Sequence, residues 1–119
     1  MNKTRKFLVL VLITALFPVT SMAASKTAMC KISSDGVVAY KGKCQFQSER
    51  GGSFSVRSLK EGKPLFGEIT DVSVYIVKPG VAEVSGLTTF GNNSRWGTAV
   101  RSQKQRACWN GSDFQVCAW

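Results

Sequence analysis

Four cysteines and the complete absence of histidine constrain this 119-residue chain more than any other feature. The cysteines are Cys30, Cys44, Cys108 and Cys117. In a small exported protein, an even number of cysteines is typical of a disulfide framework. A zinc site is not expected, because the chain has neither a C-x-x-C pair nor a histidine, and the same spacing argues against a thioredoxin-like redox site. The sequence therefore predicts two disulfides and no cofactor.

The pairing of these cysteines stays open at the level of sequence, because four cysteines allow three pairings. Local pairing, first with second and third with fourth, is favoured because each pair brackets a turn signal, "SSDG" (33–36) and "NGSD" (110–113). A strict two-residue turn in the second signal would place Cys108 opposite Asp113 rather than Cys117. A direct cross-strand bridge in the closing hairpin therefore requires a longer loop or a bulge.

Residues 1–24 have the three parts of a secretory signal peptide: a basic start, the apolar run "FLVLVLITALF" and the small residues of "PVTSMAA". The apolar run is too short for a transmembrane helix, which needs about 20 residues. We expect cleavage after Ala23 or Ala24, no stable membrane insertion afterwards, and a periplasmic address. The mature protein is then one small domain, residues 25–119.

The charge of this mature domain is lower than that of the whole chain. Without Lys3, Arg5 and Lys6, it has 13 basic residues against 7 acidic ones, a net charge of +6. Such a balance suits an acidic protein partner, an anionic lipid surface or the cell-wall polymer, or it is an ordinary solvated surface. A nucleic-acid partner is not expected, because export separates the protein from nucleic acid.

Alternation of apolar and polar residues dominates the mature domain and predicts strands. The one helix-like stretch, "FGEITDV", contains Gly67, which argues against a helix. We predict an all-β fold, a small disulfide-stapled antiparallel sandwich or partly closed barrel of about seven or eight strands. Two disulfides, each contributing about 2–3 kcal/mol, suit a domain with so small a core. The predicted strands lie in 36–42, 52–59, 71–80, 81–91, 95–102 and the closing hairpin 107–119.

No arrangement of residues points to catalysis. Enzymes need a poised acid, base or nucleophile, and this chain offers no histidine and only cysteines that are expected to be oxidised. Most of its carboxylates stand in turn contexts, and its glycines lack the spacing of a phosphate-binding loop. We predict that the protein is not an enzyme and has no catalytic residue.

A binding role is suggested by the stretch "TTFGNNSRWGTAVRSQKQR" (88–106), which joins a polar loop to aromatic and basic residues. Trp and Arg are enriched at interface hot spots, and Arg makes bidentate contacts with carboxylates and phosphates. The alternatives are a core position for the tryptophan and a solvated surface for the basic residues. The predicted partner-binding residues are Asn92, Asn93, Arg95, Trp96, Arg101, Lys104 and Arg106.

Three motifs carry a resemblance to known proteins: "C-K-I…D-G…Y-K-G-K-C-Q-F", "G-G-S-F-S-V" and "W-G…R…A-C-W…V-C-A-W". The chain resembles small exported proteobacterial proteins with an early cysteine pair and a closing C-W…C-A-W. It is also similar to periplasmic immunity proteins that neutralise peptidoglycan-targeting effectors of type VI secretion. The effectors in question have an L,D-transpeptidase-like fold. This resemblance implies an inhibitor that plugs or covers the active cleft of a toxin without catalytic residues of its own. It carries over no individual inhibitory residue.

Three functions therefore remain open for this chain. The first is a periplasmic inhibitor or immunity protein that binds a peptidoglycan-active effector enzyme. The second is a non-catalytic module for anionic envelope ligands, peptidoglycan or lipopolysaccharide. The third is a structural subunit of an envelope complex.

Overall fold

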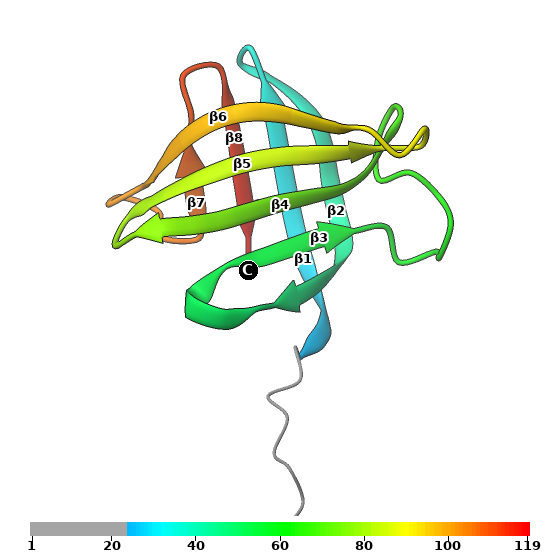
Figure 1. Ribbon diagram of the computed structural model, residues 1–119, viewed down its shortest axis with the longest axis horizontal. Coiled ribbons are helices and arrows are strands. Elements are labelled where there is room, and N and C mark those ends of the chain that lie inside the picture. Colours follow the sequence, from blue (N-terminus) through cyan, green and yellow to red (C-terminus); the bar gives the residue numbers. More distant parts are fainter. Residues whose placement is uncertain (1–23) are drawn as a thin grey trace, which may run out of the picture.

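A computed structural model of the protein describes residues 24–119, which form one closed barrel of eight antiparallel strands (Figure 1). Each strand pairs with the next along the chain, and β1 pairs with β8 to close the ring. A short 3-10 turn, η1 (Arg50–Gly52), connects β2 to β3. The strands are β1 (Ser25–Ser34), β2 (Val37–Ser48), β3 (Phe54–Arg57), β4 (Ile69–Lys78), β5 (Val81–Thr88), β6 (Asn93–Arg101), β7 (Cys108–Asn110) and β8 (Phe114–Ala118).

This architecture confirms the all-β prediction, and the barrel is closed completely rather than partly. Apart from its last residue, the predicted signal peptide lies outside the described range. Within residues 24–119, no helix is long and apolar enough to cross a membrane.

The main difference from the sequence-based strands lies at the start of the domain. We predicted no strand before residue 36 and ended the first strand at Gly42, whereas β1 covers Ser25–Ser34 and β2 continues through Gly42 to Ser48. Lysines and hydroxyl residues weaken the apolar pattern of β1. Backbone pairing with β2 on one side and β8 on the other stabilises it instead.

The barrel has the appearance of two crossed layers. Figure 1 shows β3 to β6 running across the view, while β1, β2 and β8 run steeply to them. The inward side chains of both layers fill the space between them. Fully burying a valine or isoleucine side chain contributes about 1.5–3 kcal/mol. The buried inward side chains are therefore the main source of stability of the barrel. The largest fully buried apolar side chains are Ile32, Val56, Val72, Val74, Val84 and Val116.

Both disulfides have the predicted local pairing, Cys30–Cys44 and Cys108–Cys117. The first belongs to the buried core inside the barrel. The second joins residues that are directly opposite each other on β7 and β8, and the last paired position before the loop is Asn110. The closing hairpin therefore has the longer loop that a direct bridge requires.

The second disulfide lies on the outer side of the barrel wall. Trp109 and Val116 are the next pair along the hairpin and belong to the core, so the alternation of strands turns Cys108 and Cys117 outward. Both cysteines are nevertheless only 1% exposed. Trp109 is only 3% exposed, whereas Trp119 is 56% exposed.

The alternating strand directions give the barrel two ends. The start of β1, the end of β8 and the β2–β3, β4–β5 and β6–β7 connections share one end, which we call the terminal end. The β1–β2, β3–β4, β5–β6 and β7–β8 connections share the other end, which we call the distal end. The two ends differ in charge and in packing.

Candidate functional site

The predicted partner-binding stretch does not form one surface, because β6 carries it from the distal end to the terminal end. Asn93 begins β6 and Arg101 ends it, and eight residue steps of about 3.3 Å separate these two positions by roughly 26 Å. Asn92, Arg95 and Trp96 thus belong to the distal half. Arg101, Lys104 and Arg106 belong to the terminal end.

At the distal end, the side chain of Trp96 is half-buried. This placement agrees with the alternative of a core position for the tryptophan. It occupies the shift in register between β5 and β6 and packs against the core. Its ring lies 6.4 Å from that of Phe66 and 5.7 Å from that of Phe114, measured between centroids. A Cβ atom on Gly86 would lie 2.9 Å from Cζ2 of Trp96, so only glycine leaves room for the indole. This aromatic cluster packs at the distal end of the barrel.

The polar residues beside this cluster are tied to local partners. Arg95 lies 3.8 Å from the carboxylate of Glu83, which also accepts a hydrogen bond from the Thr98 hydroxyl at 2.6 Å. The backbone N–H of Asn92 donates to the Thr88 hydroxyl at 3.1 Å. Asn92 and Asn93 are exposed. Arg95 and Trp96 also line a second, smaller hollow of about 390 Å³ at the distal end, whereas Asn92 and Asn93 are not part of its lining.

The terminal end, in contrast, has six basic side chains and one acidic side chain, that of Glu49, among residues 24–119. The distal connections carry a mixture of both signs, with Asp35, Glu61, Glu68 and Asp113 among their residues. The charge of the domain is therefore polarised along the barrel. The basic residues of the terminal end are Lys26, Arg50, Lys78, Arg101, Lys104 and Arg106.

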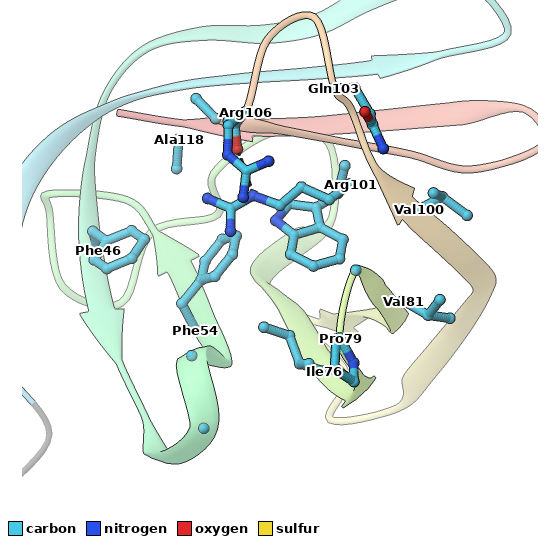
Figure 2. Close-up of a pocket in the computed structure, with 15 residues that line it drawn as sticks. Phe46, Phe54, Ile76, Pro79, Val81, Val100, Arg101, Gln103, Arg106 and Ala118 are labelled. Carbon is cyan, nitrogen blue, oxygen red and sulfur yellow. Dashed lines mark hydrogen bonds between the residues drawn. The ribbon is translucent and has the colours of Figure 1, made fainter.

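A hollow of about 680 Å³ opens in this basic end, and we call it the terminal hollow (Figure 2). Its size falls within the range of small-ligand sites, about 300–1,000 Å³. Figure 2 shows the Arg101 and Arg106 side chains reaching over it toward Phe54. Its lining is Phe46, Gly51, Gly52, Phe54, Ile76, Pro79, Gly80, Val81, Val100, Arg101, Gln103, Arg106, Ala107, Trp109 and Ala118.

The aromatic residues of the terminal hollow come from separate strands of the barrel. Phe46 of β2 and Phe54 of β3 stack with their ring centroids 5.0 Å apart. The ammonium group of Lys26 lies 5.6 Å from the centroid of Phe46, so a further cation flanks the site. Such a cation–aromatic contact contributes about 0.5–1 kcal/mol at an exposed position. The hollow thus joins an aromatic wall to positive charge.

Two contacts fix the guanidinium group of Arg101. Its Nε–H donates to the backbone carbonyl of Arg106 at 2.8 Å, and its Cζ atom lies 5.6 Å from the centroid of Trp109. Among residues 24–119, the ion pairs are Arg57–Asp71 and Arg95–Glu83. Neither arginine of the hollow therefore has a carboxylate partner in the described part of the chain.

The outer disulfide anchors the loop that carries Lys104 and Arg106. The N–H of Cys108 donates to the Gln105 carbonyl at 2.8 Å, and the Cys108 carbonyl accepts from Ser102 at 2.9 Å. The Ser102 hydroxyl in turn accepts from the Gln105 N–H at 3.1 Å. The Cys108–Cys117 bridge thus holds the end of the loop that carries Arg106 into the lining of the hollow, while Lys104 on the same loop is exposed and is not part of the lining.

Sequence reasoning found Arg101, Lys104 and Arg106 but missed Lys26, Phe46, Phe54 and Ile76. These missed residues occupy inward positions of their strands, where the sequence shows only ordinary alternation. Their meeting depends on how the barrel closes. No local motif could have indicated it.

The described residues contain no group of three or more His, Cys, Asp or Glu side chains that could hold a metal ion. The prediction that the protein has no catalytic residue stays a prediction. Searches of protein-family models, curated proteins and solved structures found no match to the chain. A fold alone does not define a function, so the geometry of the site and the sequence have to indicate what this protein does.

Proposed function

We propose that the protein is a non-catalytic periplasmic inhibitor or immunity protein that binds a cell-wall-targeting enzyme and covers its active cleft with the terminal end. The observation that carries this proposal is the polarised charge of the barrel, with two arginines over an aromatic hollow at one end that have no carboxylate partner among residues 24–119. Arg and aromatic side chains are the residue types that most often supply binding energy at protein interfaces. The motif resemblance supplies the class of partner, a peptidoglycan-targeting effector.

The terminal end has the features that such a contact needs. The β4–β5 turn and the 102–107 loop stand beside the terminal hollow and contribute Pro79, Gly80, Gln103 and Arg106 to its lining. A partner would therefore meet a rim of loops around a concave, partly apolar centre. Complementary charge accelerates such association and is weakened by salt.

The disulfides and the predicted signal peptide support an exported location. Two disulfides indicate that the chain matures in an oxidising environment outside the cytosol. The periplasm is the specific compartment that we propose, on the basis of the predicted signal peptide. Deleting residues 1–24 should leave the protein in the cytoplasmic fraction.

Affinity capture from periplasmic extract tests the proposal. A tagged form of the mature protein should retain a wall-active enzyme in a one-to-one complex and inhibit its hydrolysis of purified peptidoglycan. Recovery of no such enzyme, or of one whose activity is unchanged, would contradict an inhibitory function.

A charge-reversal pair then locates the surface on the captured complex. Lys104→Glu at the terminal end should weaken binding at least tenfold by calorimetry. Lys63→Glu, a matched reversal of an exposed lysine at the distal end, should leave the affinity within twofold of the parent. Equal effects of both variants would show that the terminal end is not the contact surface.

A second candidate function, binding to an anionic envelope polymer, is favoured by the outer face of β1 and β2. There Lys31 and Lys41 are directly opposite each other, and Lys43 is opposite Met29. Like charges in opposite positions destabilise a sheet, and a polyanion would offset that cost. Co-sedimentation with peptidoglycan or lipopolysaccharide that is lost in Lys41→Glu, but retained in Lys104→Glu, would favour this function.

The structural-subunit alternative makes a simpler prediction. A subunit of an envelope complex should be recovered from the periplasm as part of a larger assembly. Gel filtration with light scattering of the native protein distinguishes that state from the one-to-one complex of an inhibitor.

A further inference from the structure

The two arginines of the terminal hollow form an arrangement that favours an anion. Arg101 and Arg106 both line the hollow, and the backbone carbonyl of Arg106 accepts the Nε–H of Arg101. That hydrogen bond occupies one edge of the Arg101 guanidinium and leaves its Nη groups for another acceptor. Like charges held near each other repel, and the lining contains no Asp or Glu to offset this repulsion.

The acidic side chain that is nearest along the chain to the lining does not fill this role. Glu49 directly precedes η1, but it is exposed and is not part of the lining. The further cation beside the hollow, Lys26, adds positive charge over Phe46. The hollow therefore presents donors and positive charge with no internal acceptor of opposite sign.

Apolar surface surrounds these donors and restricts what kind of anion fits. Phe54 is buried, while Phe46, Ile76 and Val81 are partly buried and line the same space. An inorganic anion would leave this surface in contact with water. An anion attached to an aromatic or aliphatic body would instead remove this apolar surface from water, which favours binding.

We propose that the terminal hollow binds a carboxylate attached to an apolar body, with Arg101 and Arg106 holding the carboxylate and the aromatic wall holding the body. In the partner enzyme, this group is an acidic side chain or chain end next to a hydrophobic side chain. This identification of the ligand rests on the proposed function, in which a protein segment enters the hollow. A guanidinium fork matches the two oxygens of a carboxylate in geometry and charge.

Small probes test the site without the partner. 3-Phenylpropionate combines a carboxylate with an aromatic body, 3-phenylpropanamide removes the charge, and acetate removes the body. In an NMR titration, 3-phenylpropionate should shift the Arg101 Nε–H and Trp109 indole N–H signals saturably. The amide and acetate should bind at least tenfold more weakly. Equal binding of either control would overturn the combination that we propose.

Variants and a second anion complete the test. Arg101→Gln and Arg106→Gln should each weaken 3-phenylpropionate binding at least tenfold, while Arg95→Gln at the distal end should bind as the parent does. Arg106→Gln protects the test against misfolding, because it removes a side chain while leaving the backbone carbonyl that fixes Arg101. Unchanged binding in both hollow variants would overturn the assignment. Phenyl phosphate that binds as tightly as 3-phenylpropionate, or tighter, would overturn the choice of a carboxylate and point to a phosphate-bearing ligand.

Failure of this inference and failure of the proposed function give different results. If the captured enzyme binds the two Arg-to-Gln variants as tightly as the parent, and the probes do not bind, then the hollow is not the ligand site but the inhibitor function stands. If the probes bind as described and no wall-active enzyme is captured, the site stands without that function.

Discussion

The two disulfides face opposite sides of the barrel wall, and this difference makes a sharp prediction about stability. We compare two double variants of the mature domain. The inner variant, Cys30→Ala with Cys44→Ala, removes the bridge that lies in the core. The outer variant, Cys108→Ala with Cys117→Ala, removes the bridge that is buried on the outer side of the wall.

The loss of chain constraint is almost the same in both variants. The bridged residues are 14 apart in the inner pair and 9 apart in the outer pair. The loop-entropy relation then gives about 3.0 kcal/mol for the inner bridge and about 2.7 kcal/mol for the outer one. Entropy alone would therefore leave the two variants nearly equal in free energy of unfolding.

Packing separates the two variants. The inner sulfurs are surrounded by the closed barrel, whose wall cannot collapse into the space they leave. The outer sulfurs lie near the 102–107 loop, where Gln105 Oε1 is 3.7 Å from the Cys108 sulfur, and this loop can move to fill the gap. The cost of a deletion depends on how well the site can collapse. Two lost groups of methylene size cost about 1–2 kcal/mol, so the inner variant should be less stable than the outer one by that amount.

Urea denaturation followed by circular dichroism measures both losses. We expect the free energy of unfolding to fall by about 4–5 kcal/mol in the inner variant and by about 3 kcal/mol in the outer one. A domain of this size has a total of about 5–14 kcal/mol, so the outer variant should remain folded at room temperature. If the outer variant lost as much stability as the inner one, the assignment of the two bridges to opposite sides of the wall would be refuted. A loss below about 1 kcal/mol in either variant would refute the loop-entropy argument.

Three further predictions concern the packing and charge of the barrel. Gly86→Ala should lower the free energy of unfolding by about 1–3 kcal/mol in thermal unfolding, because the new methyl group overpacks Trp96. Adding Trp96→Phe should restore part of this loss. A Gly86→Ala variant as stable as the parent would contradict the contact. Ser53→Ala should cost about 1–3 kcal/mol in urea, because its buried hydroxyl accepts a backbone N–H of β4 at 2.8 Å, whereas Ser53→Thr keeps the acceptor and should lose less. Lys41→Glu replaces a like charge opposite Lys31 with an opposite charge. The variant should be more stable than the parent by about 0.2–1 kcal/mol at low salt, and this gain should disappear in 1 M salt. Destabilisation at low salt would show that the two lysines do not repel each other in the folded state.

The sequence predicted much of this fold because the relevant signals are short. The β4–β5 hairpin follows from two alternating runs on either side of the turn at Pro79-Gly80. The local disulfides follow from turn signals between neighbouring cysteines. The strand β1 was not predicted because its lysines and hydroxyl residues dilute the apolar pattern. Its pairing with β8 joins positions about 85 residues apart in the chain. A sequence pattern is read over the length of one strand, about 5–10 residues, and cannot detect such a pairing.

The candidate site was predicted only in part. Arg101 and Arg106 were recognised from residue type, but they were grouped with Arg95 and Trp96 because all four are close in sequence. A strand is extended, so neighbours in sequence at its two ends are far apart in space. Because β6 is long, the structure separates the four residues into a pair at each end of the strand, and the prediction of one shared surface was wrong.

The sequence by itself determined the strand-forming pattern, the favoured local cysteine pairing and the excess of basic residues, because each depends on residues that are close along the chain. The tertiary structure alone decided which basic residues share an end of the barrel and which aromatic side chains they meet. Phe46 belongs to β2 and Trp109 to β7, while the two arginines lie at the end of β6 and in the loop that follows it. These side chains line one hollow only because the ring of strands closes. Closure is a property of the long-range pairing of the whole chain, so the site arises from the fold rather than from a motif.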